Sequence, residues 1–71
     1  MVADVLVRLG KNLKRRRVRH KLSQEKLAGQ AFVSVLHLRR IENGRANPSL
    51  KVLHKLTKIL KISLRLLFLG L

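Results

Sequence analysis

Apolar residues recur every three or four positions along almost the whole chain, and each run of them follows a residue that can cap a helix. Ser and Asp side chains cap helices well because they accept a hydrogen bond from a free backbone N–H of the first turn. The candidate caps are Asp4, Ser23, Ser34, Ser49 and Ser63. They predict five helices: one to about Arg19, then 24–30, 35–42, one that carries Leu50 to Leu60, and a short last one through Phe68.

No segment alternates apolar and polar residues as a half-buried strand would, and no repeat or low-complexity linker divides the chain. A chain of 71 residues has room for one compact domain. We therefore predict an all-α fold, a compact five-helix domain over residues 1–71 with its core in about 5–69. The expected inward residues include Val5, Leu9, Leu13, Leu38 and Ile41 and, from the last helix, Leu64, Leu67 and Phe68.

The chain carries seventeen Lys and Arg against three Asp and Glu, a formal net charge of +14. Such a charge predicts an anionic partner, namely DNA, RNA or an anionic membrane surface. Eight basic residues fall between Arg8 and Lys21. They would form either an additional phosphate-binding strip or a solvated helix face. A membrane span is not expected, because the longest charge-free stretch, 27–38, is far shorter than the roughly twenty apolar residues that a span needs.

Enzymatic chemistry has no visible basis in the sequence. There is no Cys, and His20, His37 and His54 are single and lack carboxylate neighbours, so we expect no metal site. No Ser/His/Asp set and no glycine-rich phosphate loop is present. We therefore expect no catalysis, no cofactor and no small-molecule ligand.

The second and third predicted helices are separated by about four residues, which is the spacing of a helix–turn–helix. Arg17 falls four residues after Leu13 on the apolar stripe of the first helix, so its guanidinium should be partly buried and need a partner. Of the three acids, Glu42 is placed best, four residues after Leu38 on the inward edge of the third helix. We predict an Arg17–Glu42 ion pair with a structural role.

The segments LSQEKLA (22–28) and IENGRANPSL (41–50), at this separation, resemble the lambda-repressor/Cro type of helix–turn–helix regulators, also called the xenobiotic-response-element family. The resemblance covers roughly residues 6–69. It implies five helices, the third in the DNA major groove, a homodimer, and a cytoplasmic, nucleoid-associated protein of a bacterium or phage. The family's buried Arg–Glu pair falls on Arg17 and Glu42.

The resemblance also implies contact residues. The residues that fall at phosphate-binding positions are Gln24, Lys26, Asn43 and Arg45. The residues that fall where the family reads bases or neighbouring phosphates are Ser34, Val35, Leu36, Arg39 and Arg40. On a helix, residues 35, 36, 39 and 40 share the face opposite Leu38, so we expect them to point away from the core.

Several residues depart from the family pattern. Val35 and Leu36 stand where polar residues are usual; they could touch thymine methyl groups, or instead join the core or a protein interface. Arg39 is then the best candidate for a bidentate contact to guanine. Lys21, Phe32 and Lys61 stand where the family often has Gly, and a side chain in a left-handed turn costs about 1 kcal/mol.

The C-terminal stretch ISLRLLFLGL leaves Leu66, Leu69 and Leu71 without a place in the core, so we predict a homodimer that uses them, the alternative being a frayed tail. The working hypothesis is a sequence-specific DNA-binding transcriptional regulator, expected to be a dimeric repressor of palindromic operators. Its rivals are a non-specific DNA or RNA binder and a cationic membrane-active helical protein.

Overall fold

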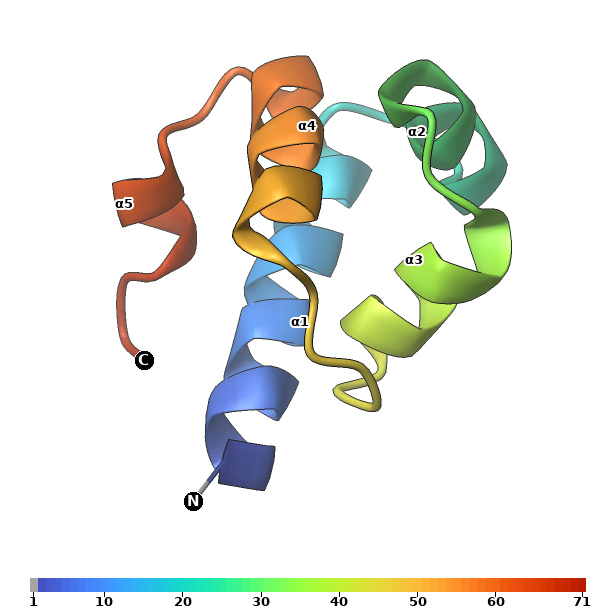
Figure 1. Ribbon diagram of the computed structural model, residues 1–71. Helices are drawn as coiled ribbons and strands as arrows, with labels where there is room; N and C mark the ends of the chain where they lie inside the picture. The colour runs from blue at the N-terminus through green and yellow to red at the C-terminus, as the bar shows by residue number, and fades with distance from the viewer. Residues whose placement is uncertain (1) are drawn as a thin grey trace.

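In a computed structural model, which describes residues 2–71, these residues form five helices and no strand. The helices are α1 (Val2–Arg19), α2 (Gln24–Ala31), α3 (Val35–Glu42), α4 (Leu50–Leu60) and α5 (Leu64–Leu67). The all-α prediction is therefore confirmed. In Figure 1, α1 and α4 run through the middle of the molecule, with α2 and α3 on one side and α5 on the other.

Four of the five predicted caps are confirmed. Ser23, Ser34, Ser49 and Ser63 each precede a helix in extended backbone conformation and accept a hydrogen bond from the backbone N–H three residues later. The prediction for Asp4 is wrong, because α1 begins at Val2 and Asp4 lies inside its first turn. An acid there still suits the positive end of the helix dipole.

The core lies where all the helices meet and is made mainly of leucine. Its buried apolar residues are Leu9, Leu13, Leu27, Ala28, Ala31, Leu38, Ile41, Leu53, Leu56, Leu60 and Leu67. Two of the expected core residues are not in it: Val5 is 43% exposed and Phe68 is 38% exposed. Val5 lies more than a turn before Leu9, near the start of α1, and Phe68 follows the last residue of the short α5. Leu64 packs against the core but is only partly buried.

Gly10 sets how closely α1 approaches the end of α3. A Cβ atom on Gly10 would stand 2.6 Å from the carbonyl oxygen of Glu42 and even closer to that of Ile41. No real side chain tolerates such contacts with backbone atoms, so the two helices can pack at this distance only with glycine here. This close approach places the C-terminal end of α3 against α1.

Three turns use the left-handed backbone conformation at residues other than glycine. Lys21, Phe32 and Lys61 have φ angles of 56°, 56° and 55°. The family resemblance implied left-handed turns at these three positions, and that prediction is confirmed. Phe32 and Lys61 each follow the last residue of a helix, where this conformation lets a backbone N–H reach back to free carbonyl groups.

The C-terminal segment returns to the N-terminal helix. The side-chain amide of Asn12 donates to the carbonyl oxygens of Leu67 and Leu69 at 3.0 and 3.1 Å. The guanidinium of Arg8 donates to the carbonyl oxygen of Gly70 at 3.2 Å. These bonds hold α5 and the following residues beside α1. No helix in residues 2–71 has the length and apolar character needed to cross a bilayer.

Candidate nucleic-acid interface

Helices α2 and α3 form the helix–turn–helix, joined by the three residues Phe32, Val33 and Ser34. Val33 donates its backbone N–H to Ala28 at 2.9 Å, which closes the end of α2. Ser34 then starts α3, because its hydroxyl accepts from the backbone N–H of His37 at 3.0 Å. The turn is therefore fixed at both ends by hydrogen bonds.

A buried ion pair anchors α3 to α1, at the residues that the sequence indicated. Arg17 donates from Nε to one carboxylate oxygen of Glu42 at 2.7 Å and from Nη2 to the other at 3.0 Å. Its Nη1 donates to the carbonyl oxygen of Leu22 at 2.8 Å. The two residues are only 9% and 6% exposed. Such a bidentate pair fixes direction as well as distance, so it orients α3 relative to α1 and to the start of α2.

Hydrogen bonds continue from this pair to the surface of α3. The amide nitrogen of Gln24 donates to Glu42 at 3.0 Å, and its amide oxygen accepts from Nε of Arg39 at 3.2 Å. Nη2 of Arg39 donates to the carboxylate of Glu25 at 3.0 Å. Sequence reasoning missed the Gln24–Arg39 and Glu25–Arg39 contacts. They depend on how α2 crosses α3, and the only sequence signal is that few acids exist to receive a guanidinium.

The predicted base-reading residues divide between surface and core. Ser34, Leu36, Arg39 and Arg40 are exposed, and Leu36 retains 56% of its accessible surface. Val35 is half-buried and packs against the core. The expectation that Val35 points away from the core is therefore wrong, because the first turn of α3 lies close enough to the core for Val35 to cover its edge. The alternative of a core role applies to Val35 and not to Leu36.

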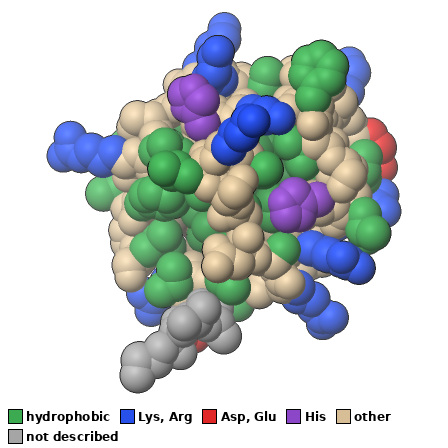
Figure 2. All heavy atoms as spheres, viewed as in Figure 1, with side chains coloured by type: hydrophobic (Ala, Val, Ile, Leu, Met, Phe, Trp, Pro, Cys, Tyr) green, Lys and Arg blue, Asp and Glu red, His purple; other side chains and the backbone are tan. Residues whose placement is uncertain are grey.

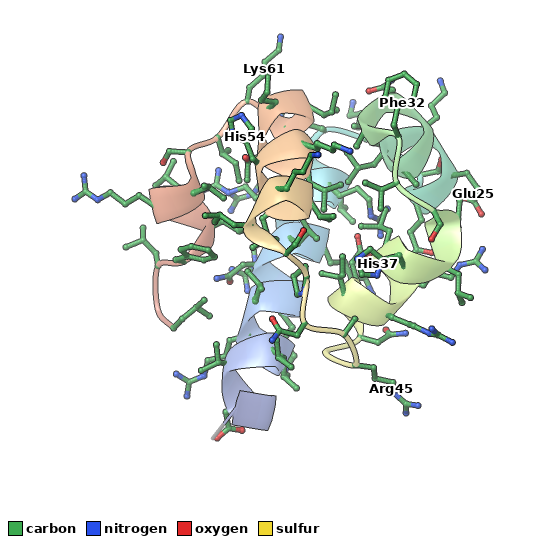
Figure 3. All side chains as sticks on the ribbon, viewed as in Figure 1. Glu25, Phe32, His37, Arg45, His54 and Lys61 are labelled. Carbon is green, nitrogen blue, oxygen red and sulfur yellow. The ribbon has the colours of Figure 1, made fainter. Side chains whose placement is uncertain are left out.

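The predicted phosphate-binding residues flank this surface. Lys26 is exposed in the first turns of α2, whereas Gln24 is half-buried. Asn43 follows the last residue of α3, and Arg45 comes two residues later, after Gly44 with its φ of +72°. Figure 3 shows Arg45 projecting away from the ribbon between α3 and α4, and Glu25 at the outer edge of α2. The basic residues at this surface thus come from both ends of the helix–turn–helix.

Positive charge dominates the surface. Figure 2 shows Lys and Arg side chains projecting from many parts of the molecule, with very little acidic surface. Two ion pairs connect side chains within residues 2–71, Arg17–Glu42 and Arg39–Glu25. The described residues contain no group of three or more His, Asp or Glu side chains that could hold a metal ion.

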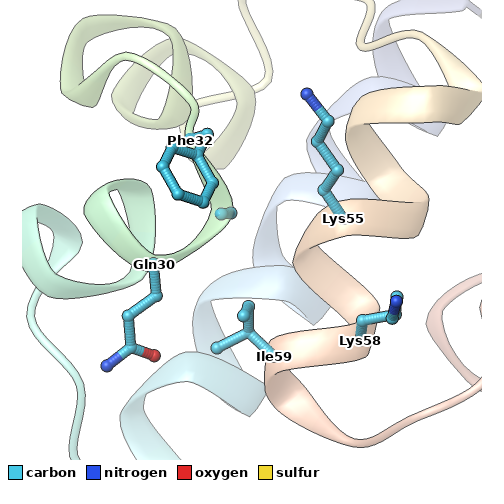
Figure 4. A pocket seen from close by; sticks show the side chains of 6 residues that line it. Gln30, Phe32, Lys55, Lys58 and Ile59 are labelled. Atoms are coloured by element: carbon cyan, nitrogen blue, oxygen red, sulfur yellow. The ribbon is translucent and has the colours of Figure 1, made fainter.

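A shallow hollow of about 180 Å³ lies between the end of α2 and helix α4. Its apolar lining comes from Ala31, Phe32 and Ile59, and its polar lining from Gln30, Lys55 and Lys58. Figure 4 shows the ring of Phe32 beside it, and that residue is 89% exposed. The hollow is separate from the hydrogen-bonded chain that leads from Glu42 to Arg39.

The residues predicted for a dimer interface lie on α5 and just after it. Leu66, Leu69 and Leu71 are 41%, 58% and 37% exposed. Leu67, between them, is buried in the core and holds the segment in place. The C-terminal segment therefore presents leucine side chains to solvent, and it lies beside the part of α1 that carries Arg8 and Asn12.

An all-helical domain with an anchored helix–turn–helix, an exposed and basic second helix in that motif, and a strongly positive surface defines a DNA-binding transcription regulator. The family model described as helix-turn-helix matches residues 13–67. The chain belongs to this family, which is of the lambda-repressor/Cro type.

Among solved structures, the chain is similar to the restriction-modification controller protein C.AhdI from Aeromonas hydrophila. The two share 36% sequence identity over 89% of this chain and 96% of the other, with a TM-score of 0.86. A search of curated proteins found no significant match.

Proposed function

We propose that this DNA-binding regulator acts as a sequence-specific repressor, binding palindromic operators as a homodimer with α3 in the major groove of each half-site. The observation that carries the proposal is the anchoring of α3. The Arg17–Glu42 pair and Gln24 hold α3 by its C-terminal half, and the exposed side of that half carries Arg39 and Arg40. A rigid helix with exposed guanidinium groups suits direct readout in the major groove.

Arg39 and Leu36 would carry most of the base readout. The end of a guanidinium can donate two hydrogen bonds to O6 and N7 of guanine, and an exposed leucine can contact the methyl group of thymine. Ser34 and Arg40 lie on either side of them and would contact bases or the adjacent backbone. Val35 is left out of this set because it covers the core.

Phosphate binding would come from both ends of the motif. Lys26, Asn43 and Arg45 are exposed polar or charged side chains at its edges. The amide of Gln24 is engaged on both sides by protein groups, so its contribution would come from the backbone. Among the first-turn N–H groups of α2, that of Lys26 donates to the hydroxyl of Ser23. The N–H groups before it have no acceptor within the helix, and such groups bind phosphate.

Dimerisation would bring the exposed leucines of the C-terminal segment out of water. Leu66, Leu69 and Leu71 are exposed apolar side chains that a second copy could cover. A symmetric dimer would place two α3 helices on half-sites one helical turn apart, about 34 Å. The similarity of this chain to a restriction-modification controller protein supports a role in regulation for this chain as well. We further propose that the protein has no catalytic activity and works on bacterial or phage DNA in the cytoplasm.

The test is selection of bound duplexes from a random pool at about 150 mM salt, followed by footprinting on the enriched sequence. We expect an enriched palindrome with two protected half-sites centred about 34 Å apart. Absence of any enriched sequence, with equal affinities for random duplex and RNA, would overturn the proposal in favour of a non-specific binder.

A further inference from the structure

A continuous chain of hydrogen bonds links the buried ion pair to the exposed guanidinium of α3. It runs from Arg17 through Glu42, Gln24 and Arg39 to Glu25, with every distance between 2.7 and 3.2 Å. Its inner end is dry, since the side chain of Glu42 is 1% exposed. Its outer end is open, since the side chains of Arg39 and Glu25 are 51% and 64% exposed.

Only one edge of the Arg39 guanidinium is occupied by this chain. Nε donates to Gln24 and Nη2 donates to Glu25. A guanidinium has five N–H groups in a fixed plane, so Nη1 and the second hydrogen of Nη2 remain for another acceptor. These two nitrogens form the edge that contacts O6 and N7 of guanine in a bidentate manner. Arg39 is therefore held without being blocked.

Gln24 is chemically suited to its place in this chain. The side chain there must donate to the carboxylate of Glu42 and accept from the guanidinium of Arg39. A carboxamide does both, whereas a carboxylate cannot donate and an ammonium group cannot accept. Through this amide the direction of the exposed guanidinium is tied to the rigid, buried pair.

Glu25 is an unusual residue for this surface. It is one of three acids in a chain of net charge +14, and it lies beside a cation expected to face DNA. A carboxylate near the phosphate backbone opposes binding to any duplex. While it holds Arg39, it occupies the Nε–Nη2 side of the guanidinium, which a phosphate oxygen could otherwise use. The edge that remains, formed by Nη1 and Nη2, is the one that suits O6 and N7 of guanine.

We propose that Gln24 and Glu25 are positioning residues that set the sequence specificity of α3, by directing Arg39 toward guanine and by keeping it from phosphates. Gln24 orients the guanidinium, and Glu25 lowers affinity for DNA that lacks a guanine at that place. The proposal rests on the proposed function, in which α3 reads bases through Arg39.

The decisive comparison is between E25Q and D4N. Each removes one of the three acids and raises the net charge by the same amount, but Asp4 lies in the first turn of α1 and takes no part in the chain from Glu42 to Glu25. The probes are a duplex selected by the wild-type protein from a random pool and a shuffled duplex of the same composition. Melting temperatures verify that both variants are folded.

We expect E25Q to bind the shuffled duplex more tightly and to lower the ratio of the two affinities by about fivefold, the upper range for an exposed ion pair. D4N should shift both affinities together and leave the ratio unchanged. Equal ratios for E25Q and D4N would overturn the inference while leaving the proposed function intact.

A second measurement uses 7-deazaguanine, which lacks the N7 acceptor, in place of each guanine of the selected duplex in turn. One such substitution should weaken binding of the wild-type protein about tenfold, within the range for a bidentate base contact. The same substitution should have little effect on Q24A or R39A. If Q24A retains the full sensitivity to N7, Gln24 does not position Arg39. If R39A, which has no donor for N7, retains it, or if the pool yields no preferred duplex, the base-reading role fails and the inference fails with it.

Discussion

Replacing Glu42 by Gln tests whether the buried pair holds α3 in place. The change keeps the size of the side chain but removes the negative charge that faces Arg17 at 2.7 and 3.0 Å. It also sets a second amide against the amide nitrogen of Gln24, which donates to Glu42 at 3.0 Å. Arg17, which is only 9% exposed, would then hold its charge in the interior without a counter-charge.

The expected cost is large for a chain of this length. Breaking a buried ion pair by removing one partner costs about 3–5 kcal/mol. A domain of 71 residues is expected to have a free energy of unfolding of about 4–11 kcal/mol in total. At about 4–8 °C per kcal/mol for small domains, E42Q should lower the melting temperature by at least about 12 °C.

The assay is thermal unfolding followed by circular dichroism, with E25Q as the matched control. E25Q removes the same charge from the exposed Arg39–Glu25 pair, whose cost should stay within about 1 kcal/mol. Replacing Arg17 and Glu42 together by Leu should recover most of the loss, because no unpaired charge remains inside. A melting temperature of E42Q close to that of E25Q would refute the reasoning that the buried pair anchors α3.

Further predictions concern packing, strain, charge and assembly. G10A should lower the free energy of unfolding by about 3 kcal/mol in urea titrations, because its Cβ would meet backbone atoms of α3; unchanged stability would contradict the close approach. F32G should raise stability by about 1 kcal/mol through relief of the left-handed conformation, whereas F32A, which keeps a Cβ, should not; equal effects would exclude strain as the cause. The logarithm of the affinity for DNA should fall with the logarithm of the salt concentration at a slope of about −4.5 if about five phosphates are neutralised, and a slope near zero would argue against phosphate contacts. Leu66→Glu should shift the sedimentation coefficient from dimer to monomer without altering the helical signal, and an unchanged coefficient would place the interface elsewhere.

Much of the fold could be predicted because its determinants are local. Four serine caps and the spacing of the leucines define where α2 to α5 begin. The Arg17–Glu42 pair was also within reach, since an arginine on an apolar stripe needs a carboxylate and very few exist. The caps depend on a few neighbouring residues, and the partner of Arg17 is limited by the fact that the chain has only three acids.

What could not be predicted depends on distances between helices. Val35 looks exposed on a helical wheel, but the first turn of α3 lies near enough to the core for it to be half-buried. The contacts of Arg39 with Gln24 and Glu25 depend on how α2 crosses α3, and the spacing of residues within each helix does not give that crossing. The start of α1 was misplaced because Asp4 suits the first turn of a helix as well as its cap.

The central claim is that α3, held by Glu42 and Gln24, reads base sequence and does not merely bind a polyanion. It is tested most directly by competition at about 150 mM salt between a duplex selected from a random pool and a shuffled duplex of equal length. Sequence-specific regulators bind their sites about a thousandfold or more tighter than other DNA. We expect a ratio of at least about a hundredfold, since Leu36 provides apolar contact only, and a marked fall for R39A. A ratio near one, unchanged in R39A, would contradict the claim.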